Sequence, residues 1–207
     1  MKEKIFNRLL WGLLAATLLI VLGVSARNWF RPKVEPLPML ATVPEFSFTE
    51  SSGEPFGLQQ LRGYIWLADF IFTNCAGTCP IMTTQMTELQ SAFAEEKLEV
   101  RLVSFTVDPE RDTPEVLSRF AEGYGAARDR WFFITGPGEQ MQNLAKEGFM
   151  LAAATGGADV KEAIIHSNRF VLVDREGRIR KYYDGTETGI AKQIIQDIKV
   201  LIAEEPS

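Results

Sequence analysis

Residues 64–80 read YIWLADFIFTNCAGTCP. The first nine are apolar or aromatic except for Asp69, which is typical of a central strand buried on both faces of a sheet. Cys75 and Cys79 follow at once, and Pro80 is a residue favoured in the first turn of a helix. The stretch therefore predicts a buried strand, a turn that carries both cysteines, and a helix that begins at Pro80 with Cys79 at its N-cap.

The flanking sequence alternates strand and helix patterns. Predicted strands lie at 46–48, 64–72, 98–107, 131–134, 169–173 and 179–183, and predicted helices at 80–96, from 113 onward, at 139–147 and at 190–203. Ser51-Ser52-Gly53 indicates a hairpin near the start of the domain, and Thr113 is a candidate N-cap. The order indicates an α/β domain: a thioredoxin-like mixed sheet flanked by helices, with an N-terminal hairpin extension.

The N-terminus is expected to be a membrane anchor. Residues 9–26 carry no charge, and about 18 residues at about 1.5 Å each span about 27 Å, close to the hydrocarbon core of a bilayer. Lys2, Lys4 and Arg8 precede the run, which places residues 1–8 in the cytoplasm and the rest outside it.

Two features follow that run. Residues 27–43 contain three prolines and read as an extended tether, and residues 44–204 are expected to form the domain. Val24-Ser25-Ala26 resembles a cleavage site, so a cleaved signal peptide is the alternative to a single transmembrane helix. Either reading places the folded part outside the cytoplasm, where unprotected thiols tend to oxidise.

Composition excludes one class of partner. Hydrophobic residues make up 46% of the 207, enough for one substantial core, and the formal net charge is −5. The domain has no basic cluster, so a nucleic-acid partner is not expected. The acidic turn Asp108–Asp112 initiates a helix and could also receive a basic partner.

Three residues are the candidates for metal binding or redox chemistry. Cys75 and Cys79 are the only cysteines, and a helix N-terminus favours the thiolate, which is both the nucleophile and the metal-binding form. His166, the only histidine, precedes a strand expected to neighbour the strand that leads into the cysteines. Two thiolates and an imidazole suit copper or zinc, whereas the thiols alone suit redox exchange, and spacing does not separate the two. Met82 and Met86 are expected in the core.

Three motifs resemble those of the Sco/SenC family of copper-binding cytochrome c oxidase assembly proteins. Residues 69–80 resemble its C-x-x-x-C-P signature, 107–114 its second hallmark and 166–177 its third, in the family's order. Ala76 and residues 163–165 depart from common family choices. The resemblance implies a thioredoxin-like fold that binds one copper, as Cu(I) or Cu(II), through Cys75, Cys79 and His166.

The resemblance also implies partners and a location. Family members deliver copper to the binuclear copper site of cytochrome c oxidase, or reduce its cysteines, from an N-terminal anchor that faces the periplasm or the mitochondrial intermembrane space. We therefore expect a membrane-anchored copper metallochaperone in the inner membrane. The alternative is an extracytoplasmic thiol–disulfide oxidoreductase in which Cys75 and Cys79 are redox-active and keep partner cysteines reduced.

Overall fold

The computed structural model describes residues 11–14, 16–23, 35–151 and 167–204. The chain divides into two units, Met1–Glu35 and Pro36–Ser207. In the first unit, residues 11–14 and 16–23 are helical and exposed. Within the described ranges no helix has both the length and the apolar character needed to cross a bilayer. The predicted span 9–26 extends beyond those ranges and stays a prediction.

The second unit is built on one mixed sheet of eight strands in the order β1-β8-β7-β4-β5-β6-β2-β3. The strands are β1 (Ala41–Thr42), β2 (Ser47–Glu50), β3 (Pro55–Gly57), β4 (Ile65–Ile71), β5 (Val100–Thr106), β6 (Trp131–Thr135), β7 (Arg169–Val173) and β8 (Arg178–Asp184). β4, β5 and β6 pair in parallel, and the remaining pairings are antiparallel. The parallel centre requires helical crossovers, which the sequence supplies between these strands.

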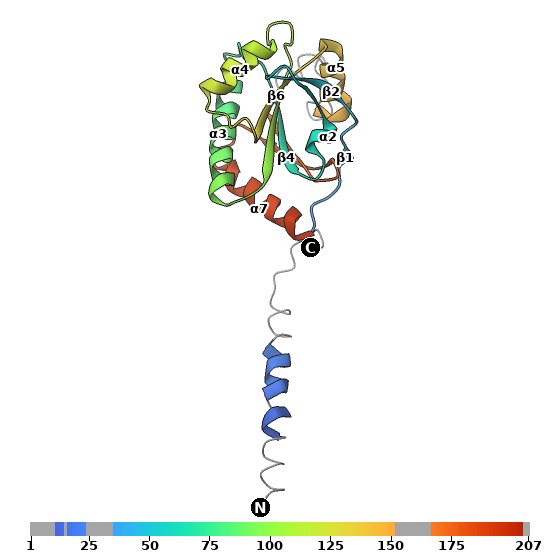
Figure 1. The fold of residues 1–207 in the computed structure, drawn as a ribbon, viewed down its shortest axis with the longest axis vertical. Helices are drawn as coiled ribbons and strands as arrows, with labels where there is room; N and C mark the ends of the chain where they lie inside the picture. Colours follow the sequence, from blue (N-terminus) through green and yellow to red (C-terminus); the bar gives the residue numbers. More distant parts are fainter. Residues whose placement is uncertain (1–10, 15, 24–34, 152–166, 205–207) are drawn as a thin grey trace, which may run out of the picture. The chain divides into compact units, whose positions relative to one another are not determined.

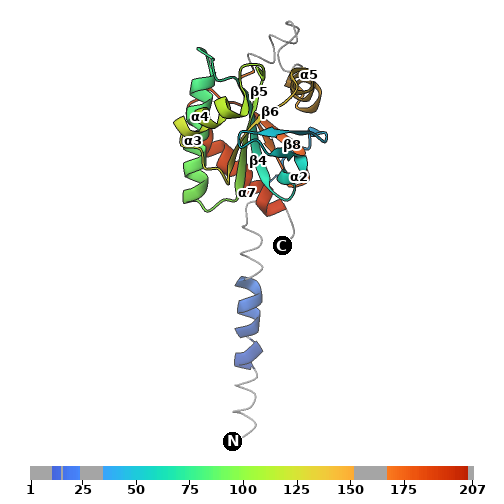
Figure 2. The same cartoon turned by 45° about the horizontal axis from the view of Figure 1, so that its top comes forward.

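Helices cover both faces of the sheet. They are α2 (Leu58–Leu61), α3 (Cys79–Glu95), α4 (Pro114–Gly123), α5 (Gly138–Asn143), the π-helical turn η1 (Leu144–Gly148) and α7 (Ile190–Glu204). Figure 1 shows α3 and α7 on one side of the sheet and α2 and α5 on the other, and Figure 2 shows the same division after rotation. This confirms the predicted thioredoxin-like α/β architecture with a mixed sheet flanked by helices.

The central strand β4 has no exposed residue, as predicted. Side chains alternate along a strand, so its two faces enter two separate cores. Ile65, Leu67 and Ile71 join the core beneath α3 and α7. Trp66 and Phe70 join the core on the opposite face. Burial on both faces explains why this stretch reads as a continuous apolar run.

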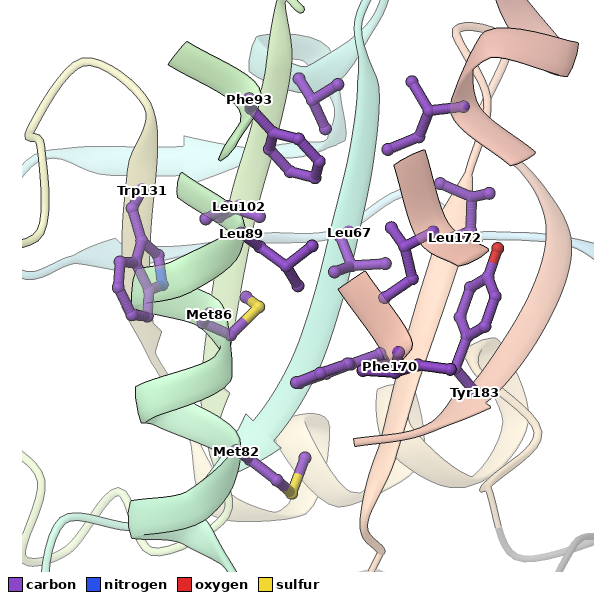
Figure 3. Packing of buried hydrophobic residues seen from close by; sticks show 14 of the residues in the cluster. Leu67, Met82, Met86, Leu89, Phe93, Leu102, Trp131, Phe170, Leu172 and Tyr183 are labelled. Atoms are coloured by element: carbon purple, nitrogen blue, oxygen red, sulfur yellow. The ribbon is translucent and has the colours of Figure 1, made fainter. Parts of the chain in front are cut away.

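The helix that follows the cysteines packs through one stripe. Met82, Met86, Leu89 and Phe93 are fully buried at helical spacing. Figure 3 shows these side chains pointing from α3 toward Leu67 and other residues of the sheet. The prediction that Met82 and Met86 belong to the core is confirmed.

Several boundaries differ from those predicted. α3 begins at Cys79 with Thr78 as N-cap, so Cys79 is the first helical residue and not the N-cap. The cause is that proline fits the second helical position as well as the first, because its missing N–H needs no partner at either. The predicted helix 139–147 is a short α-helix that ends in the π-helical turn η1. The hairpin at 51–53 and the Thr113 N-cap are confirmed.

The folded unit also begins before Pro44. Ala41 and Thr42, in the expected tether, pair with β8. The Leu37 N–H donates to Glu204 Oε1 at 2.7 Å, and the buried Arg180 donates to the carbonyls of Leu37 and Pro38. These bonds fasten the entering chain to α7 and β8.

Asp69 is the one charged residue of β4, and it lies inside the α3-facing core. Its side chain is fully buried, and neither carboxylate oxygen has a hydrogen-bond partner among the described residues. Burial raises the Asp69 pKa from 3.8 to about 7, and the nearby Ser104 hydroxyl on β5 offsets this only in part. The carboxylic acid is therefore protonated through much of the range in which ordinary aspartates are ionised.

Replacing Asp69 by Asn should stabilise the fold at neutral pH. The native state binds the Asp69 proton more tightly than the unfolded state, so wild-type stability falls as pH rises from about 4 to about 7 and is level above that. Each unit is worth about 1.4 kcal/mol, so the gain from Asp69→Asn should approach about 4 kcal/mol above pH 7. Urea unfolding of the reduced protein across this range measures it. The exposed Asp129→Asn is the control, and a pH-independent difference for Asp69→Asn would contradict the assignment.

Candidate functional site

Both cysteines lie at the carboxyl end of β4, where the chain turns into α3. Cys75 is half-buried in the turn, and Cys79 is buried as the first residue of the helix; both are free thiols. The turn is held by the Cys75 N–H, which donates to the Phe72 carbonyl at 3.2 Å. The Gly77 N–H donates to Cys75 Sγ at 3.3 Å. The two sulfurs are thus presented together at a helix N-terminus.

The Cys75 thiol is the more acidic of the two. Burial alone would raise its pKa, but hydrogen bonds from the Cys79 side chain and from the backbone N–H groups of Cys79, Gly77 and Thr78 outweigh burial. The net pKa of Cys75 therefore lies below the usual value of a thiol. Backbone N–H groups at the start of a helix stabilise an anion in this way.

The Cys79 thiol is shifted in the opposite direction. Burial raises its pKa to about 12, and the Cys75 side chain and the charge of Asp69 add to the rise, while a backbone hydrogen bond from Phe72 opposes it. In the absence of a metal, the site therefore holds one proton on Cys79 while Cys75 ionises. A metal that takes both sulfurs must displace that proton, because thiolate is the form that binds.

Two surface grooves flank the cysteine turn. One is lined by Phe72, by residues 107–111 and by Gly138 and Gln142. The other is lined by Pro80, Ile81, Thr84, Gln85, Glu88, Thr188 and Gly189, and Ile81 is half exposed there. The first groove thus includes Phe72, which precedes the cysteine turn, and the second includes Pro80, which follows it.

The acidic turn that the sequence placed on the surface is only partly there. Glu110 is exposed and Asp108 half-buried, with an ion pair of 2.9 Å to Arg111. Asp112 is 1% exposed and points into the domain, where Thr73 and Thr106 bind its carboxylate. The turn therefore presents less negative charge than its sequence indicates, because Arg111 pairs with the Asp108 carboxylate and Asp112 is buried.

His166 lies outside the described residues, so its position relative to the sulfurs is not part of the structure. Among the residues that are described, no group of three or more His, Cys, Asp or Glu side chains could hold a metal. Ser167, the next residue, is buried two residues before β7 begins at Arg169. β7 pairs with β4 as predicted, with Trp66 opposite Val173 and Ala68 opposite Val171.

Gly185 allows the residues that lead into β7 to lie close to α3, the helix that begins at Cys79. The Gly185 N–H donates to the Asn168 carbonyl at 2.6 Å. A Cβ at Gly185 would lie 3.1 Å from that carbonyl oxygen and 3.2 Å from Met82 Cε, one turn into α3. Only glycine allows this close approach without displacement of a neighbour.

Sequence reasoning missed three residues that shape the site. Asp69 is an unexplained exception in an apolar strand, Asp112 reads as a surface charge, and Gly185 carries no motif. A lone carboxylate within a run that is otherwise apolar was the signal available for Asp69. Nothing local distinguishes Asp112 from Asp108, since their burial depends on how two loops meet.

Comparison with known proteins gives a consistent result. The SCO1/SenC family model matches residues 35–203. The SCO1 protein homolog of Bacillus subtilis (strain 168) is 36% identical over 197 residues, which cover 95% of this chain and 96% of that protein. A Stutzerimonas stutzeri protein named "Putative copper-binding protein" is 31% identical over 148 residues, 70% of each chain.

A solved structure agrees with the sequence matches. BsSco, described as a member of the Sco family of cytochrome c oxidase assembly proteins with a disulfide switch, has a TM-score of 0.71 and 36% identity, over 83% of this chain and 100% of that one. The family model covers the second unit from its first residue to residue 203, and the cysteine turn lies within the match. The chain belongs to the SCO1/SenC family.

Proposed function

We propose that this protein is a membrane-anchored copper metallochaperone that binds one copper ion through Cys75, Cys79 and His166 and supplies it to the binuclear copper site of a cytochrome c oxidase. The observation that carries the proposal is the pair of free thiols at the N-terminus of α3, at an accessible end of the sheet. Membership of the SCO1/SenC family and the copper-binding name of one relative support copper as the cargo.

The chemical character of the proposed ligands also favours copper. Thiolate and imidazole are ligands that copper prefers, and a three-ligand site leaves the ion open to exchange. Met82 and Met86 are core residues, so the described residues near the sulfurs offer no competing thioether. Copper capture then requires a third ligand from elsewhere in the chain.

The register of the sheet supports His166 as that ligand. Pairing of β7 with β4 joins Ala68 to Val171, and the same register continued for four residues sets Ser167 opposite Phe72, three residues before Cys75. Gly185 lies close both to Asn168, just before β7, and to Met82 on α3, so the residues that lead into β7 are near α3. The chain therefore leads toward the cysteine turn as it approaches residue 166.

The split acidity of the thiols suggests an order of events. Cys75, half-buried and with the lowered pKa, meets the incoming ion first. Cys79 then releases its proton as its sulfur binds. Transfer to a partner runs by stepwise replacement of these thiolates by thiolates of the recipient, through the grooves that border the turn.

The proposal also places the protein in a membrane, with its folded domain outside the cytoplasm. Residues 9–26 would form a single transmembrane helix in the inner membrane, with the domain in the periplasm, or in the intermembrane space of a mitochondrion. The uncharged run and the preceding basic residues support this arrangement. An anchor keeps the domain at the membrane in which the proposed recipient resides.

A second function is favoured by one observation. A half-buried thiol of lowered pKa beside a buried thiol of raised pKa is the arrangement of a dithiol reductant. The Cys75 thiolate would attack a partner disulfide, Cys79 would resolve the mixed disulfide, and two electrons and two protons would pass to the partner as the Cys75–Cys79 disulfide forms. The disulfide switch identified in BsSco fits this chemistry.

Copper addition should give a direct spectroscopic signature. Cu(II) added to the reduced domain should produce intense sulfur-to-copper charge-transfer absorption, because both sulfurs bind as thiolates. Cys75→Ser and Cys79→Ser should each abolish the wild-type band, and Thr84→Ala, on the exposed side of α3, should keep it. A band that survives in either cysteine variant would contradict the two-thiolate site.

Replacing His166 by Ala should separate the two functions. Loss of a second-sphere group around a metal costs about 10–100-fold in affinity, so loss of a direct ligand should weaken Cu(I) binding by more than about 100-fold. Competition with a chromophoric Cu(I) chelator measures the affinity, and Asn168→Ala is the neighbouring control. Unchanged one-to-one binding in His166→Ala would exclude the three-ligand site, and the oxidoreductase would remain.

The two thiols should differ in reactivity. In the reduced metal-free protein at pH 7, iodoacetamide should modify Cys75 more than about tenfold faster than Cys79, because Cys75 is both more ionised and more exposed. Mass spectrometry of peptides after timed labelling assigns the rates. In urea the rates should become equal, and equal rates in the folded protein would contradict the assigned acidities.

A further inference from the structure

We propose that Asp112 is a positioning residue that holds the cysteine turn in its binding geometry. The inference deepens the proposed function and rests on it only in taking Cys75 and Cys79 as the working residues. Asp112 is a buried carboxylate, 1% exposed, that neither touches the sulfurs nor belongs to the ligand set. Its role would be exerted through Thr73, two residues before Cys75.

The carboxylate of Asp112 collects donors from two separate segments. From the segment after β4, the Thr73 N–H donates to Oδ2 at 3.1 Å and the Thr73 hydroxyl to Oδ1 at 2.5 Å. From the end of β5, the Thr106 hydroxyl donates to Oδ2 at 2.5 Å. Hydrogen bonds to an ionised acceptor are roughly twice as strong as neutral ones, so this carboxylate joins the two segments firmly.

The residues at the end of β5 that bind Asp112 are themselves held by the sheet. Thr106 pairs with Ile71 in the sheet, and the Val107 N–H donates to the Ile71 carbonyl at 2.8 Å. The Asp112 N–H donates to the Asp108 carbonyl at 2.9 Å, and the Asp108 N–H donates to the Thr106 hydroxyl at 3.0 Å. Asp112 is thus anchored to the sheet by its own backbone before its side chain reaches Thr73.

Thr73, the other partner of the Asp112 carboxylate, lies at the start of the turn that contains Cys75. Strand pairing ends at Ile71, so from Phe72 onward the ladder no longer holds the chain. Cys75 is then held within the turn by the bond from its N–H to the Phe72 carbonyl at 3.2 Å and by the bond from the Gly77 N–H to its sulfur at 3.3 Å. The bonds between Thr73 and Asp112 tie the start of the turn to the rest of the domain. Asp112 therefore fixes the segment that leads directly into Cys75 and the turn between the two sulfurs.

A carboxylate is required at this position because all three donors converge on its two oxygens. Asparagine offers one oxygen and an NH2 group, and the NH2 would face a Thr hydroxyl or the Thr73 N–H. The hydroxyls can rotate but the backbone N–H cannot. Asp112→Asn removes the negative charge and one of the two acceptor oxygens, so it should weaken the bonds to Thr73. Thr73→Val removes the hydroxyl donor while keeping the shape of the side chain.

The test compares these variants with a purely structural control. Thr113 is the N-cap of α4 beside Asp112, where its hydroxyl accepts from the Val116 N–H, and it makes no bond to the cysteine turn. Thr113→Ala should lower the melting temperature yet leave the thiol site unchanged. Asp112→Asn and Thr73→Val should weaken Cu(I) binding by about tenfold, the lower range for groups that orient metal ligands, and shift the charge-transfer band.

A copper-free measurement keeps this inference separate from the proposed function. In a glutathione redox buffer, the Cys75–Cys79 equilibrium of Asp112→Asn and Thr73→Val should move toward the dithiol by about threefold or more, since a mobile turn lowers the effective concentration of one thiol for the other. This shift is expected even if the wild type binds no copper, an outcome that would remove only the chaperone proposal.

Three outcomes decide the role of Asp112. Wild-type redox equilibrium in folded Asp112→Asn and Thr73→Val would overturn it. An equal shift in Thr113→Ala would also overturn it, because general destabilisation would then be the cause. If Asp112→Asn does not fold, Thr73→Val alone carries the comparison, and a shift there with none in Thr113→Ala supports the positioning role.

Discussion

The pairing of β4 between β5 and β7 is the constraint on which the rest of this structure depends. β4 loses contact with water on both faces and receives strand partners on both edges, so its residues have one position available to them. The last residue of β4 in the ladder is Ile71, and both thiols follow within eight residues. A turn that leaves a rigid strand and enters a buried helix begins and ends at fixed points, which is what a two-sulfur site needs.

Electrostatics then makes two identical side chains different. Cys75 faces backbone N–H groups and is half-buried, whereas Cys79 is buried in the core that also contains the unpartnered Asp69 carboxyl group. Ionising the second thiol beside the first is unfavourable in the metal-free protein, and a cation at the sulfurs removes that cost. The metal-free site therefore holds a thiolate and a thiol. A second thiolate forms when a cation binds the sulfurs, whereas oxidation removes two electrons and the remaining proton as the Cys75–Cys79 disulfide forms. This is compatible with both proposed functions, since each uses both sulfurs.

Much of the fold was predictable because its signals are local. The apolar run of β4, the helical stripe of Met82, Met86 and Leu89, and the Thr113 N-cap each follow from residues within a few positions of one another. Boundaries were less predictable: Cys79 is inside α3, and Ala41–Thr42 belongs to the sheet, because the energy of one more helical residue or of a two-residue strand depends on neighbours distant in the chain.

The sequence by itself determined the candidates for the chemistry, namely two thiols at a strand-to-helix turn and a single imidazole, together with the family that shares this pattern. Only the tertiary structure decided which carboxylates serve that site. Asp108 and Asp112 belong to one acidic turn, yet one stays near the solvent and the other enters the domain to bind Thr73, which precedes it by 39 positions. The physical reason is that burial and hydrogen-bond partners of a polar side chain come from segments brought together by strand pairing, and composition carries no record of those contacts.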